Sequence, residues 1–89
     1  MQQKNKKNLF FAKTLGKIIK EYRSKKCSIN QIANEYDLDV GNTSRIENGL
    51  IDARLITLWK ISEALNIKPS EIIIKLETKL GDNFHFFDE

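Results

Sequence analysis

Two short helical patterns, separated by only a few residues, are the feature that most constrains the fold of this 89-residue chain. The first begins at Ser28, a typical helix N-cap, and Gln31 stands three positions later, at the capping-box spacing. Residues 37–39 (Asp-Leu-Asp) interrupt the pattern, and Asp is a turn residue that can also cap a following helix. A second helix is predicted over Val40–Glu47, ending at Asn48-Gly49. The sequence therefore predicts two short helices joined by a tight turn.

Three other segments have the apolar spacing of longer amphipathic helices. One runs from Leu9 to about residue 26, and another spans residues 55–65. The last is predicted to begin at Pro69 and to end at Gly81. The face predicted to point inward on the segment at 55–65 consists of Leu55, Leu58, Trp59, Ser62 and Leu65, with Trp59 in the core. With no internal repeat and no clear strand pattern, we expect an all-α fold of five helices.

The ends of the chain differ in composition from residues 9–80, which we expect to form one domain. Residues 1–8 are polar and basic, and we predict a flexible arm there. The tail at 81–89 carries Phe84, Phe86 and Phe87, the first two alternating as in a strand. This tail has two interpretations: it covers its own core, or it contacts a second subunit or another protein. We favour the contact with a second subunit, because exposed aromatic side chains are costly.

Positive charge is concentrated near the N-terminus. Residues 1–26 hold nine Lys or Arg and one acid, Glu21, whereas residues 27–89 hold six basic and eleven acidic residues. This asymmetry favours a polyanionic partner for one end of the molecule, although a simple solvated helix face is an equal alternative.

Several classes of protein are excluded by composition. A single Cys (Cys27) and a single His (His85) leave no disulfide framework and no Cys/His zinc site. No apolar run is long enough to span a membrane, so we expect a cytoplasmic protein. No nucleophile with a neighbouring His and no glycine-rich phosphate loop is present, so we expect no enzyme activity, no metal and no cofactor.

The stretch from Ser28 to Ala33 (Ser-Ile-Asn-Gln-Ile-Ala) and the one from Thr43 to Gly49 (Thr-Ser-Arg-Ile-Glu-Asn-Gly) resemble a known motif. They are similar to the helix-turn-helix of the phage repressor and Cro family, also called the XRE type. The resemblance covers about residues 15–76, with the motif at about 28–48. It implies a compact lambda-repressor-like domain whose third helix lies in the DNA major groove.

The resemblance also implies residue roles. Base-facing positions are Val40, Gly41, Ser44 and Arg45. Phosphate-contacting positions are Ser28, Asn30, Asn42, Asn48 and Arg54, and Arg23 pairs with Glu47 as a structural ion pair. Arg45 can make a bidentate contact with guanine. The family therefore implies a sequence-specific regulator, which we expect to be a repressor that binds double-stranded DNA as a homodimer on an imperfect palindrome.

Some of these positions keep an alternative. Ser28 can cap its helix, contact phosphate, or do both, and Asn48-Gly49 can serve only as a helix stop. Acidic or apolar residues also stand where the family often has Gly, Ser or Thr, or basic residues: Asp37, Asp39, Leu50, Ile51 and Asp52. They predict weaker or unusual DNA binding. They also support a second hypothesis, a protein-interaction module (antitoxin-like or a transcription cofactor) that keeps the fold without tight DNA binding.

Overall fold

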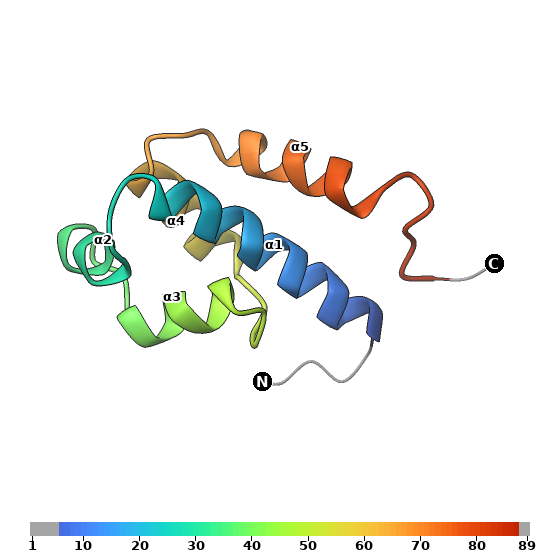
Figure 1. Ribbon diagram of the computed structural model, residues 1–89, viewed down its shortest axis with the longest axis horizontal. Helices are drawn as coiled ribbons and strands as arrows, with labels where there is room; N and C mark the ends of the chain where they lie inside the picture. Colours follow the sequence, from blue (N-terminus) through green and yellow to red (C-terminus); the bar gives the residue numbers. More distant parts are fainter. Residues whose placement is uncertain (1–5, 88–89) are drawn as a thin grey trace.

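The computed structural model describes residues 6–87 and contains five helices in that range, as predicted (Figure 1). The helices are α1 (Lys6–Ser24), α2 (Ile29–Glu35), α3 (Val40–Glu47), α4 (Leu55–Ala64) and α5 (Pro69–Leu80). No strand occurs within the described range. The all-α fold class is confirmed.

Helix α1 crosses the middle of the molecule, with α5 on one side and α3 on the other (Figure 1). Its apolar stripe packs against both neighbours, and α4 packs against α5. The core consists of Leu15, Ile18, Ile19, Ile32, Ile46, Leu58, Ile61, Ala64, Leu65, Ile72 and Leu76. Burial of such side chains contributes about 1.5–3 kcal/mol each. The short helix α3 therefore packs directly on α1, and α2 packs on α3.

The first helix starts earlier than predicted. It begins at Lys6, so residues 6–8, which we expected in the arm, are helical. Lys has a good helix propensity, and neither Pro nor Gly interrupts this stretch. Residues 1–5 of the predicted arm lie outside the described residues.

Two positions on α4 differ from the prediction. Trp59 is 52% exposed and Leu55 is 68% exposed, so neither is a core residue. The buried stripe of α4 is centred on Leu58, Ile61 and Leu65, and Leu55 and Trp59 lie on its flank. The apolar face of α4 is therefore wider than the area that the rest of the molecule covers, so Leu55 and Trp59 stay exposed.

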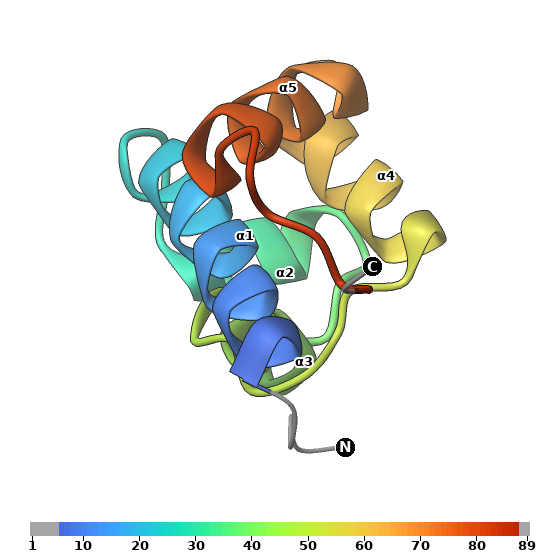
Figure 2. The same cartoon turned by 90° about the vertical axis from the view of Figure 1, so that its right-hand side faces the viewer.

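The C-terminal tail folds back on its own chain and forms no strand within its described part, which ends at Phe87. The centroid of the Phe84 ring lies 5.9 Å from that of Phe10 and 6.3 Å from that of Phe11. The centroids of the Phe86 and Phe11 rings are 5.5 Å apart. Figure 2 shows the tail running from α5 past α1 toward the loop that precedes α4. Phe84 and Phe86 thus make the intrachain contact of the first interpretation, and a contact of the tail with a second subunit stays a prediction. Phe87 stays 86% exposed.

Candidate nucleic-acid interface

The turn between α2 and α3 is held by local hydrogen bonds. The Ser28 hydroxyl accepts from the Gln31 N–H (3.1 Å), which caps α2. Asp37 adopts φ +55°, the left-handed conformation that lets the chain reverse, and the Leu38 N–H donates to the Ala33 carbonyl (3.0 Å). Capping by Ser28 is thus present in the structure, and its contact with phosphate stays a prediction.

A carboxylate caps the N-terminus of α3. Asp39 Oδ2 accepts from the Asn42 N–H (2.8 Å), and the Thr43 hydroxyl donates to the Asp39 carbonyl (2.9 Å). Thr43 is buried, so its hydrogen bond to Asp39 is shielded from water and holds the first turn of α3. A negative charge at the N-terminus stabilises a helix, because it interacts favourably with the positive end of the helix dipole. The same charge repels a DNA phosphate that approaches it.

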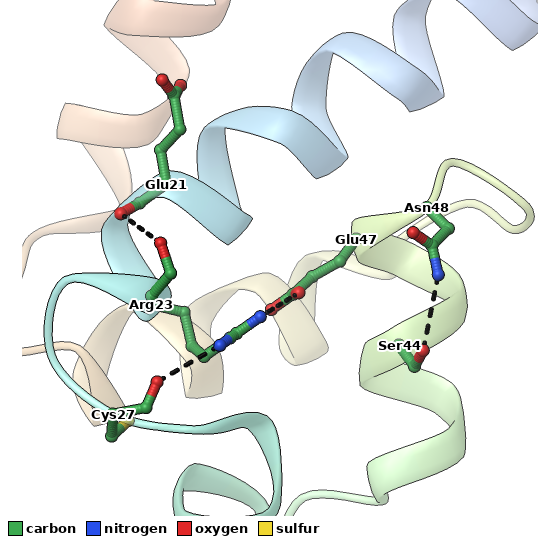
Figure 3. A network of polar contacts seen from close by, with 7 residues as sticks. Glu21, Arg23, Cys27, Ser44, Glu47 and Asn48 are labelled. Carbon is green, nitrogen blue, oxygen red and sulfur yellow. Dashed lines mark hydrogen bonds and ion pairs between the residues drawn. The ribbon is translucent and has the colours of Figure 1, made fainter.

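The other end of α3 is joined to α1 by the predicted ion pair. Arg23 Nε donates to Glu47 Oε2 (2.9 Å) and Arg23 Nη2 donates to Glu47 Oε1 (2.8 Å), a bidentate arrangement. Arg23 Nη1 also donates to the Cys27 carbonyl (3.2 Å), as Figure 3 shows. The Glu47 side chain is only 3% exposed. Its hydrogen bond raises the pKa of Arg23, an effect that outweighs the opposing effect of partial burial.

Sequence reasoning missed a close contact at the same end of α3. A Cβ on Gly16 would clash with the carbonyl oxygen of Ile46 and would lie 2.5 Å from that of Glu47. Glycine is therefore required where α1 meets the last turn of α3. The available signal was a glycine inside an otherwise helical pattern, which often marks a close approach.

Residues predicted to contact bases share the exposed side of α3. Gly41 and Ser44 are partly buried, and Arg45 and Asn48 are exposed. A Cβ on Gly41 would lie 3.4 Å from Arg45 Nη1 and 3.5 Å from Asp39 Oδ2, so both charged groups flank this position. Asn48 Nδ2 lies 3.5 Å from Ser44 Oγ, one turn apart on the helix (Figure 3). Arg45 is the one basic side chain of α3.

Three predicted contact residues meet at one hollow beside α3. Asn42, Arg45 and Arg54 line a hollow of about 710 Å³, together with Asp52 and Thr57. Arg54 stands at the N-cap position of α4, so the α3–α4 loop brings it next to α3. Val40 lies at the first turn of α3, whereas Ser28 and Asn30 belong to α2 and do not line this hollow.

The described part of the chain gives no sign of two other kinds of site. Within residues 6–87, no three His, Cys, Asp or Glu side chains gather in a way that could hold a metal ion. In the same range, no helix is both long and apolar enough to cross a membrane.

Comparison with known proteins now identifies the family. A helix-turn-helix family model matches residues 19–72, more than half of the chain. The chain belongs to the XRE-type helix-turn-helix family. This is a family of DNA-binding transcriptional regulators, which agrees with the motif at residues 28–48.

Two solved structures show related architecture. The clp gene regulator ClgR from C. glutamicum has a TM-score of 0.73 at 18% identity, with 82% of this chain and 96% of that chain covered. The restriction-modification controller protein C.AhdI from Aeromonas hydrophila has a TM-score of 0.64 at 27% identity, with 68% and 94% covered. A search of the curated proteins finds no match. These likenesses confirm the five-helix fold.

Proposed function

We propose that this protein is a sequence-specific transcriptional repressor that binds an imperfect palindrome as a homodimer, with α3 in the major groove. The observation that carries the proposal is the exposed side of α3. One long basic side chain, Arg45, stands there among small ones, on a helix that the Arg23–Glu47 pair anchors to α1. Such a helix can enter the groove without steric conflict and can present a guanidinium to a guanine edge.

Each predicted contact then has a role. Val40, Gly41, Ser44 and Arg45 face base edges, with Val40 suited to a thymine methyl group. Backbone contacts come from Asn42, Asn48 and Arg54, and from Ser28 and Asn30 at the start of α2. Phosphate contacts set the register of the protein on DNA, and base contacts supply the sequence information.

An apolar surface on α4 and α5 supports the homodimer. Leu55, Trp59, Ile73 and Ile74 line a hollow of about 490 Å³ beside Pro69. Ile74 is 62% exposed, and Ile56 is exposed nearby on α4. Exposed apolar surface of this kind marks an interaction site, and a two-fold dimer pairs the same surface of both copies. We propose this α4–α5 surface, rather than the tail, as the subunit contact.

The experiment that tests the proposal is selection from a random-sequence DNA pool, followed by salt titration of the selected site. We expect an enriched palindrome with half-sites about 10–10.5 base pairs apart or a multiple of that. Affinity should fall about 10³–10⁵-fold between about 50 and 200 mM salt. A pool that shows no enrichment contradicts the proposal.

A second candidate function rests on the carboxylates near α3. Asp39 caps α3 on the side that should meet DNA, and Asp52 lines the hollow that contains Arg54. Leu50, in the same loop, is half exposed. These groups suit a protein-interaction module, antitoxin-like or a transcription cofactor, whose partner docks on this side. Such a module would keep its partner when Arg45 is replaced.

A further inference from the structure

Three lysines form an exposed row on α1 that the contacts proposed above do not use. Lys13, Lys17 and Lys20 recur at i, i+4 and i+7, so they share one face of the helix. All three are exposed, and their side chains form no ion pair or hydrogen bond with any described residue. We call these three residues the α1 lysine row.

The α1 lysine row begins where α3 ends. It lines a hollow of about 500 Å³ together with Glu47 and Asn48, the last residues of α3 and its cap. The contact is close: a Cβ on Gly49 would lie 2.8 Å from Lys13 Cα. The packing of Gly16 on the same turn fixes α1 against α3. The row therefore moves with α3 as one body and continues the surface that includes Asn48.

The charge in this hollow is positive. Its acidic residue is Glu47, and both carboxylate oxygens of Glu47 already bind Arg23. Glu21 lies on α1 next to Lys20 in sequence, but it does not line the hollow. The hollow that Arg45 and Arg54 line also contains Asp52, and Asp39 caps α3 nearby, so carboxylates offset the positive charge there. The α1 lysine row adds positive charge that no neighbouring carboxylate of the described residues offsets.

The length of the row suits a nucleic-acid backbone. Seven residues of helix rise by about 10 Å. One DNA strand advances about 3.4 Å along the axis per phosphate, so about three phosphates fit beside the row.

We propose that Lys13, Lys17 and Lys20 contact phosphates, extending the DNA interface from Asn48 along α1. The inference rests on the proposed function and deepens it by adding a surface that binds the backbone. Since these side chains reach no base edge, they strengthen binding to every sequence alike.

The test replaces all three lysines by glutamine (K13Q/K17Q/K20Q). The matched control is K60Q/K75Q/K79Q, which removes the same charge from exposed positions on α4 and α5. Binding is measured by fluorescence anisotropy at several salt concentrations, on the selected duplex and on a scrambled duplex of equal length. Circular dichroism checks that both variants keep the helical content of the wild type.

For the α1 variant we expect the slope of log K against log salt to fall by about 2.7, or about 0.9 per lost contact. Affinity should fall by the same factor on both duplexes, which leaves the specificity ratio unchanged. The control should keep the wild-type slope. An unchanged slope in the α1 variant, or an equal change in the control, overturns the proposal.

The two proposals fail in different ways. If the wild type binds the scrambled and selected duplexes equally, the sequence-specific repressor is refuted. If the slope of log K against log salt still falls in the α1 variant, the α1 lysine row is retained as a DNA contact. A wild type that selects a palindrome while the α1 variant keeps its slope refutes only the row. A wild type that binds neither duplex refutes both.

Discussion

One side of α3 is buried against the rest of the molecule, whereas the opposite side is exposed to solvent. On the buried side, near the C-terminal end of the helix, a bidentate ion pair and a glycine contact join α3 to α1. On the exposed side lie the side chains of Asn42 and Arg45. The same eight-residue helix thus carries a structural side and a side that is free to contact a ligand.

This difference separates stability from recognition. A contact on the buried side holds the direction of the helix, so its loss lowers the free energy of unfolding. A contact on the exposed side adds little to folding, because exposed surface substitutions away from helix caps usually change stability by less than about 0.5 kcal/mol. Substitutions on the buried side of α3 should therefore affect folding, and those on the exposed side should affect DNA binding.

The largest effect is expected for Glu47→Ala. It leaves Arg23, whose side chain is only 13% exposed, without its partner, and breaking such a pair costs about 3–5 kcal/mol. Urea unfolding followed by circular dichroism measures this loss. Glu63→Ala, an exposed acid on α4, is the control. A loss below about 1 kcal/mol at position 47 would mean that the pair does not anchor α3.

Gly16→Ala should destabilise the same end by about 1–3 kcal/mol, because the new methyl group meets backbone carbonyls that cannot turn away. Thr14→Ala is a control two residues earlier on α1, at a partly exposed position. Thermal unfolding measures the loss of stability in each variant relative to the wild type. If Gly16→Ala is as stable as the wild type, α1 and α3 can separate, and the buried side is not a rigid anchor.

Arg45→Ala tests the exposed side of α3. Loss of a bidentate guanine contact should cost about 1–3 kcal/mol of discrimination at one base pair, with no change in unfolding. Competition binding on the selected duplex and on single-base variants of it measures this cost. Arg54→Ala is the matched control, since a phosphate contact should weaken binding equally on all sequences. Equal losses on every duplex after Arg45→Ala would remove the proposed base contact.

Much of this arrangement could be predicted from the sequence. Helix ends were set by local chemistry, such as the Ser28 and Asp39 caps and the left-handed residues Asp37, Gly49 and Gly81. The Arg23–Glu47 pair followed from the family resemblance and is formed in the structure.

The remaining features depend on which surfaces meet in three dimensions. Trp59 looked buried because periodicity identifies an apolar face but not how much of it a neighbour covers. The packing of Phe84 against the Phe10 and Phe11 rings of α1 depends on the direction in which the tail leaves α5, and no spacing rule predicts that direction. The meeting of Lys13 with the end of α3 likewise required the crossing of two helices at Gly16. Roles at individual DNA contacts stay predictions, because neither cap geometry nor burial distinguishes a phosphate contact from a solvated side chain.

The last substitution, Asp39→Ser, is expected to change stability only slightly, and it tests the cap at the N-terminus of α3. Serine keeps a side-chain oxygen for the Asn42 N–H, so the free energy of unfolding should change by only a few tenths of a kcal/mol, whereas Asp39→Ala should lose about 1 kcal/mol with the cap. Removal of the carboxylate should also tighten DNA binding, because a charge that repels phosphate is gone. Urea unfolding and anisotropy on the selected duplex measure the two effects separately. Weaker binding by the serine variant would mean that the carboxylate itself contacts a base, such as the amino group of cytosine, and that the acidic residue at this end belongs to the recognition surface.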